Sequence, residues 1–183
     1  MHRKFRFGFV ASAAIAAMAL VGSPLTASAD NTTASVGVVA GSLTLVSAGN
    51  VDFGTVVQDG TDHTPTASGL YDVSDASGSG AGWNLSISAT PFDDGAGHTL
   101  PNSSADSASS ACDAGSNCEL AQNLVGYPLT VPTDGSTATL FDANTATGMG
   151  NQTATVNYSE YVSPSAAGGS YSATWTITLS SAP

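Results

Sequence analysis

The chain has 183 residues, with 14 Asp and Glu, only 3 Lys and Arg, and a formal net charge of −11 at pH 7. The basic residues Arg3, Lys4 and Arg6 all lie at the extreme N-terminus, so residues 30–183 carry every acid and no Lys or Arg. Without a basic patch, residues 30–183 exclude nucleic acid as a partner and disfavour direct binding to the phosphates of anionic lipids or teichoic acids.

Residues 1–29 have the three parts of a secretory signal peptide. A basic head is followed by the apolar residues 7–21 and by a small-residue cleavage site, Ala27-Ser28-Ala29. The apolar run is shorter than the roughly 20 residues that cross a bilayer, so we expect no membrane span. Residues 30–183 are then the secreted part, and their length is that of one domain.

The rest of the chain is predicted to be all-β. Short apolar runs alternate with clusters of Gly, Asp, Ser and Pro, which is typical of a β-sandwich or barrel. We expect a single antiparallel β-sandwich of Greek-key or immunoglobulin-like type over residues 30–183. In chain order, strands are expected at 42–46, 51–57, from 70, at 82–90, within 119–131, and at 138–141, 153–162 and 171–180.

Two details of this pattern concern the middle of the chain. Residues 100–116 are rich in Ser and Ala without a buried pattern, so we expect an exposed excursion there. Pro128 and Pro132 indicate that the strand within 119–131 lies at a sheet edge, because proline cannot donate to a β-ladder.

Two predicted strands alternate strictly between apolar and polar residues, and each carries a tryptophan. In the first, Trp83, Leu85 and Ile87 share one face, and Asn, Ser and Thr occupy the other. In the second, Trp175 and Ile177 lie on the apolar face and the other face is entirely Ser and Thr. We expect these two strands to supply the centre of the domain.

Both strands resemble motifs of the WxL-domain family. Gly82 to Ser88 is similar to the first Trp-x-Leu motif, and Tyr171 to Ile177 is similar to the closing segment, with Ile177 where the family usually has Leu. The resemblance covers roughly residues 43–183. The family consists of exported proteins of Gram-positive bacteria that attach non-covalently to cell-wall peptidoglycan. The resemblance therefore implies a secreted, WxL-like β-sandwich domain over residues 30–183 that binds the wall at the cell surface.

Two interpretations of the tryptophans remain open. As core anchors, each would bury on the order of 200 Å². Alternatively, one of them presents its face to a sugar ring of the wall glycan. Their position on apolar faces favours the core. Binding would then depend on surface tyrosines, or on carboxylates that meet the free amines of peptidoglycan stem peptides. The candidate motif residues are Trp83, Leu85, Tyr171, Trp175 and Ile177, and the candidate surface tyrosines are Tyr71, Tyr127, Tyr158 and Tyr161.

The two cysteines, Cys112 and Cys118, are predicted to form a disulfide, because an exported chain with two closely spaced cysteines usually pairs them. A metal site at this pair is disfavoured, since no histidines cluster with the cysteines.

No catalytic constellation is found in the sequence. His63 and His98 lie in no Ser-His-Asp or Cys-His context. Asp93 and Asp94 are adjacent in a Gly-rich turn, where solvated carboxylates are common, and they are weak candidates for a calcium site or for paired glycosidase carboxylates. We therefore expect no enzyme activity and no cofactor.

Two functional hypotheses follow. The first is a non-catalytic module that binds peptidoglycan or another wall glycan, with other cell-surface proteins as further partners. The second is a structural subunit of a surface layer or a pilus-like assembly. The chain ends directly after the last predicted strand, so we expect no covalent wall anchor.

Overall fold

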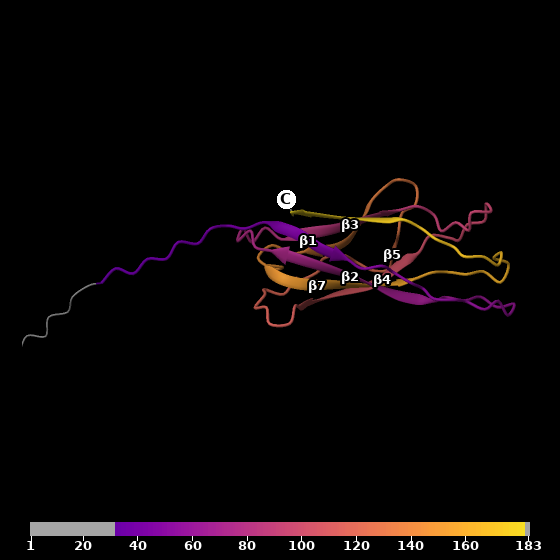
Figure 1. The fold of residues 1–183 in the computed structure, drawn as a ribbon, viewed down its shortest axis with the longest axis horizontal. Coiled ribbons are helices and arrows are strands. Elements are labelled where there is room, and N and C mark those ends of the chain that lie inside the picture. The colour runs from indigo at the N-terminus through magenta and orange to yellow at the C-terminus, as the bar shows by residue number, and fades with distance from the viewer. Residues whose placement is uncertain (1–31, 182–183) are drawn as a thin grey trace, which may run out of the picture. The chain divides into compact units, whose positions relative to one another are not determined.

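Figure 1 shows the computed structural model, which describes residues 32–181. The predicted signal peptide, residues 1–29, lies outside the described residues. The chain divides into two units, Met1–Gly37 and Val38–Pro183. Every strand belongs to the second unit, and the described part of the first, residues 32–37, forms neither strand nor helix.

The second unit consists of two antiparallel sheets, which confirms the predicted all-β sandwich. The larger sheet has the strand order β1-β2-β7-β4-β5, and the smaller has the order β6-β3-β8. No helix occurs among residues 32–181. The strands are β1 Leu43–Ala48, β2 Thr66–Asp75, β3 Trp83–Ala89, β4 Ser104–Cys112, β5 Leu129–Thr130, β6 Ala138–Ala143, β7 Gly150–Ser159 and β8 Trp175–Ser181.

The core lies between the two sheets and follows the period-2 pattern of the strands. In β3, Trp83, Leu85 and Ile87 have no exposed surface, while the alternate polar residues are partly exposed. In the facing sheet, Val156 and Tyr158 of β7 are also fully buried. Each such apolar side chain contributes about 1.5–3 kcal/mol through burial. The alternation seen in the sequence thus directs one face of each strand into the sandwich.

The first tryptophan motif is held in the core by its neighbours. The indole N–H of Trp83 donates a 2.9 Å hydrogen bond to the carbonyl of Gly148, and the indole stacks on Phe141 at a centroid distance of 5.2 Å. Gly82 has a φ of 82°, and a Cβ at this position would overlap the carbonyl oxygen of Ala143. Glycine therefore precedes Trp83 because the chain turns in the left-handed region against a neighbouring backbone.

Two of the expected elements are wrong. Residues 51–57 form no strand, although Val51 and Phe53 pack against the core. Residues 104–112, expected to be an exposed excursion, form β4, which pairs with both β7 and β5. A register shift between Ala105 and Ser107 marks a β-bulge in β4. The bulge breaks the two-residue period, so the buried pattern of this strand is not visible in the sequence.

The C-terminal strand also differs from the expectation in its position. β8 pairs with β3, so the two tryptophan strands are neighbours in one sheet. However, β3 is central in that sheet, whereas β8 is at its edge. The predicted edge strand within 119–131 is present but short, because only Leu129–Thr130 form β5 at the end of the larger sheet.

Candidate functional site

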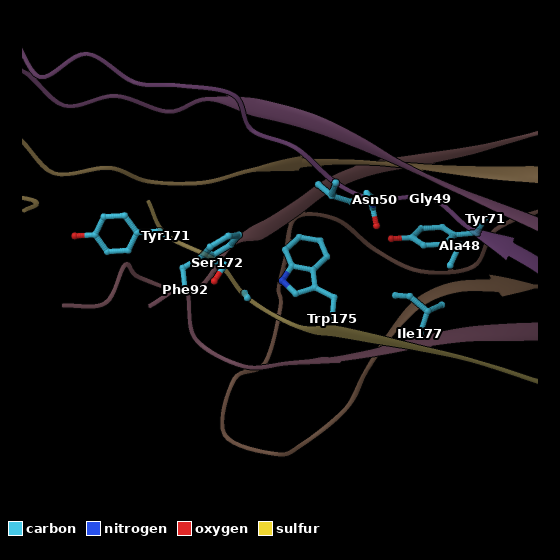
Figure 2. A pocket seen from close by; sticks show the side chains of 11 residues that line it. Ala48, Gly49, Asn50, Tyr71, Phe92, Tyr171, Ser172, Trp175 and Ile177 are labelled. Atoms are coloured by element: carbon cyan, nitrogen blue, oxygen red, sulfur yellow. The ribbon is translucent and has the colours of Figure 1, made fainter. Parts of the chain in front are cut away.

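The candidate site lies where the edge strands of the two sheets approach each other. β1 is the edge of the larger sheet, β8 is the edge of the smaller one, and the two strands lie close together. A cavity of about 390 Å³ opens between them. Figure 2 shows the side chains around it. Its lining includes Asn50, Tyr71, Phe92, Tyr171, Ser172, Trp175 and Ile177.

Trp175 is the central aromatic residue of this cavity. Three rings contact its indole edge-to-face: Tyr158 at a centroid distance of 4.9 Å, and Phe53 and Phe92 each at 6.3 Å. Unlike Trp83, Trp175 is only half-buried, and among residues 32–181 no hydrogen bond to its indole N–H is found. The surrounding rings fix the indole, which lies among the other side chains that line the cavity (Figure 2).

The main chain of β8 adds polar groups at the same place. The carbonyl of Thr174 accepts a 3.0 Å hydrogen bond from the N–H of Thr90, so the backbone of Thr174 faces β3. In an antiparallel pair the residues alternate in this respect. The N–H and C=O groups of Trp175 and Ile177 therefore point to the open edge of the sheet, where a ligand can reach them.

Two buried tyrosines lie beneath the indole. The hydroxyls of Tyr71 and Tyr158 are 2.7 Å apart, and burial raises the pKa of both phenols. Both therefore stay neutral at physiological pH. A Cβ at Gly69 would lie 2.5 Å from the Tyr71 hydroxyl, so this glycine leaves room for the tyrosine pair. An aromatic cavity with neutral hydroxyl and amide groups can stack on a sugar ring and hydrogen-bond to its hydroxyls.

A second cavity of about 320 Å³ shares Phe92 and Tyr171 with the first. Its wall also includes Phe53 and Glu160. Glu160 is only 2% exposed, and its Oε2 accepts a 2.5 Å hydrogen bond from the Ser103 hydroxyl. Its Oε1 is buried and has no hydrogen-bond partner within residues 32–181. Burial raises the pKa of this carboxyl above its usual 4.5, although the bond from Ser103 acts in the opposite direction.

The raised pKa of Glu160 predicts that Glu160→Gln stabilises the protein at neutral pH. The folded protein holds a proton on Glu160 more tightly than the unfolded chain does. The contribution of Glu160 to stability is therefore fully present below about pH 4.5 and is lost as the pH rises through the raised pKa of the folded state. The stability advantage of Glu160→Gln should be largest at pH 7 and shrink toward pH 4, as measured by urea denaturation across pH.

The same substitution at Glu119, which is exposed, is the control for this experiment. Acids such as Asp94, whose pKa is lowered, make the wild type and both variants less stable at low pH. Subtracting the wild-type free energy of unfolding from that of each variant at the same pH removes this shared effect. A pH-independent difference for Glu160→Gln would contradict the prediction.

The remaining candidate residues lie in different places. Leu85 is fully buried beside Trp83, and Ile177 lines the first cavity. Tyr171 lines both cavities and donates a 2.9 Å hydrogen bond to the Ala167 carbonyl. The structure therefore brings Tyr171, Trp175 and Ile177 together at the cavity and separates them from the core residues of the first motif.

The predicted disulfide between Cys112 and Cys118 is present, with a Cα–Cα distance of 5.7 Å. Cys112 pairs with Gln152 near the start of β7, whereas Glu160 follows the end of that strand. The disulfide is therefore at the opposite end of the sandwich from the cavity beside Glu160.

The carboxylates of Asp93 and Asp94 are used within their own loop. Asp93 accepts a 2.6 Å hydrogen bond from the N–H of Gly95. Asp94 accepts one from the N–H of Ala96 and a 2.6 Å bond from Nδ1 of His98, and the His98 bond lowers the Asp94 pKa to about 2. Among residues 32–181, no three His, Cys, Asp or Glu side chains come together as a metal site.

Four residues of the two cavities could not be found from the sequence: Asn50, Phe53, Phe92 and Glu160. Each belongs to a loop or a strand end, and although Phe53 and Glu160 fall within predicted strands, no sequence signal places any of the four at a cavity. They meet because the loops after β1, β3 and β7 converge at one end of the sandwich, where Asp93 bridges to Ser172 and His63 to Val162.

Comparisons with known proteins give one match. A model of the family described as "WxL domain surface cell wall-binding" matches residues 23–183. No curated protein and no solved structure matches the chain. No helix that could cross a membrane is found in residues 32–181.

Proposed function

Since this chain belongs to the WxL family of surface cell-wall-binding domains, we propose that it binds peptidoglycan non-covalently. In this proposal it is a secreted, non-catalytic module at the surface of a Gram-positive bacterium. The family match supports association with the cell wall; the choice of peptidoglycan rests on the chemistry of the cavity and on the charge of the chain.

The observation that carries the proposal is the environment of Trp175. Its indole is half-buried, is held by three other rings, and lines a cavity of about 390 Å³. Asn50 and Ser172 lie at the same cavity, and their side chains offer uncharged hydrogen-bond donors and acceptors. An apolar ring face with a few neutral polar groups suits a neutral sugar, which has an apolar face and several hydroxyls.

The charge of the domain supports a glycan rather than an anionic wall polymer. Residues 30–183 contain all 14 Asp and Glu residues and no Lys or Arg. Such a surface repels teichoic-acid phosphates, whereas the glycan strands offer neutral rings and, in places, free amines.

The absence of catalysis is part of the proposal. His63 hydrogen-bonds to Asp59 and His98 to Asp94, each four residues away in the same loop and on an exposed carboxylate or ring. Neither histidine contacts a serine or cysteine nucleophile in the described hydrogen bonds. Each histidine therefore has a role in stabilising its own loop, and neither needs a catalytic role to account for its position.

A structural subunit is the second candidate, and the open edges of β1 and β8 favour it. Free edges offer main-chain groups to a further strand, which is how many subunits polymerise. Sizing of the secreted form separates the two functions. A monomer at high concentration without wall material supports the binding module, and spontaneous polymers support the subunit.

A sedimentation assay on purified sacculi tests the proposal. One half of the sacculi keeps its teichoic acids, and the other half is stripped of them by acid. We expect the protein to sediment with both preparations and an acidic secreted protein of matched charge to stay in solution. Loss of binding on stripped sacculi would show that the ligand is the anionic polymer.

A further inference from the structure

We propose that the cavity beside Glu160 binds a primary ammonium group of the wall polymer, next to the sugar held at Trp175. This inference rests on the proposed function and names a further feature of its ligand. Two sources supply such a group in the wall: an amino sugar that has lost its acetyl group, and the free side-chain amine of a stem peptide.

The carboxyl of Glu160 is buried without a neighbouring positive charge among residues 32–181. The residue is 2% exposed, and one of its two carboxyl oxygens has no hydrogen-bond partner in the described part of the chain. A buried carboxylate is costly unless a cation or several hydrogen bonds accompany it. Residues 30–183 contain no Lys or Arg, so this domain has no permanently charged side chain to supply that cation. A cation from outside completes the site.

The wall of the cavity beside Glu160 is partly aromatic. Phe53, Phe92 and Tyr171 all line it. The negative faces of aromatic rings attract an ammonium group, and the attraction is stronger where water is excluded. A carboxylate combined with aromatic rings is selective for an organic cation over a neutral hydroxyl.

A further acceptor lines the same cavity, and a carboxylate lies behind one of its lining residues. Gln58 lines it, and its Nε2 donates to the carbonyl of Ser163 at 3.2 Å, which leaves the amide oxygen as an acceptor. Gly169 also lines it, and a Cβ built there would be 3.4 Å from Oδ2 of Asp94. The low pKa of Asp94, caused mainly by its bond from His98, keeps that carboxylate negative. The potential around the cavity therefore favours a positive group.

The cavity beside Glu160 adjoins the cavity at Trp175. Phe92 and Tyr171 line both of them. A sugar ring that packs on Trp175 thus places its substituents close to the cavity beside Glu160. The structure provides adjacent places for a neutral ring and for a positive substituent, which together distinguish a glycan with free amines from a fully acetylated one.

Two matched probe pairs test the inference. The first pair is an oligosaccharide of glucosamine and the N-acetylglucosamine oligosaccharide of the same length. The second pair is a short peptide with a free side-chain amine and the same peptide with that amine acetylated. The wild-type protein should bind the amine member of one pair about tenfold more tightly than its acetylated partner. The pair that shows this preference identifies the source of the amine.

Glu160→Gln keeps the shape of the side chain and its bond from Ser103 but removes the charge. We expect it to abolish the preference for the amine and to leave the affinity for the acetylated oligosaccharide unchanged. Glu119→Gln is the matched control, because Glu119 is exposed and lines neither cavity, and it should retain the full preference. Melting temperatures of both variants verify that each is folded.

The outcomes separate this inference from the proposed function. Equal binding of the amine and acetylated members of both pairs by the wild type would overturn the ammonium site while leaving sugar binding intact. An amine preference that survives Glu160→Gln would also overturn it, because the carboxyl would then serve only its bond to Ser103. If the wild type bound neither oligosaccharide, the proposed function would fail as well.

Discussion

Replacing Trp83 with alanine is expected to lower the free energy of unfolding by about 3–5 kcal/mol. The indole is fully buried, stacks on Phe141 and donates its N–H to Gly148. Alanine would leave a cavity in the middle of the core and an unpaired carbonyl at Gly148.

Urea denaturation followed by circular dichroism measures this loss. Trp83→Phe is the informative control, because it retains most of the packing and removes the hydrogen bond to Gly148, at an expected cost of roughly 1–3 kcal/mol. A Trp83→Ala variant within 1 kcal/mol of the wild type would contradict the core position of this side chain.

Replacing Trp175 with alanine is expected to weaken binding to purified sacculi by about 2 kcal/mol or more, which is roughly thirtyfold. Trp175 lines the larger of the two cavities, and its indole N–H has no hydrogen-bond partner among residues 32–181. Because the side chain is only half-buried and lies on an edge strand, we expect a smaller loss of stability than for Trp83→Ala.

Binding isotherms on sacculi, together with melting temperatures, measure the two effects separately. Tyr161→Ala serves as the control, since Tyr161 is an exposed aromatic residue that lines neither cavity and should leave binding unchanged. If Trp175→Ala were destabilised as strongly as Trp83→Ala yet bound the wall normally when folded, Trp175 would be a core residue and the sugar site would have to lie elsewhere.

The strands that the sequence predicted well are those in which one apolar face meets the core without interruption. β3 and β7 show this alternation, with Leu85 and Val156 fully buried at its centre. The disulfide between Cys112 and Cys118 was also predictable, because these are the two cysteines of the chain and they are closely spaced behind a predicted signal peptide.

The strand predictions were wrong where the apolar pattern of a segment does not show whether its backbone pairs with another strand. β4 contains only Ser, Ala, Asp and Cys, and its bulge shifts the inward face between Ala105 and Ala108. Residues 51–57 carry apolar side chains that pack on the core, yet their backbone pairs with no strand. The β-strand propensity of a segment reflects the packing of its side chains, whereas backbone pairing depends on which strand lies beside it in the fold.

The sequence by itself determined the all-β class, the two tryptophan strands and the excess of acids without a basic partner. Only the tertiary structure decided that Trp83 belongs to the core and Trp175 to a cavity, and that Glu160 lines a second cavity that shares Phe92 and Tyr171 with the first. The physical reason is that alternation shows which side chains point inward but not what covers them. β3 has a strand on each side, while β8 has one neighbour and an open edge, so the same motif is sealed in the first case and accessible in the second.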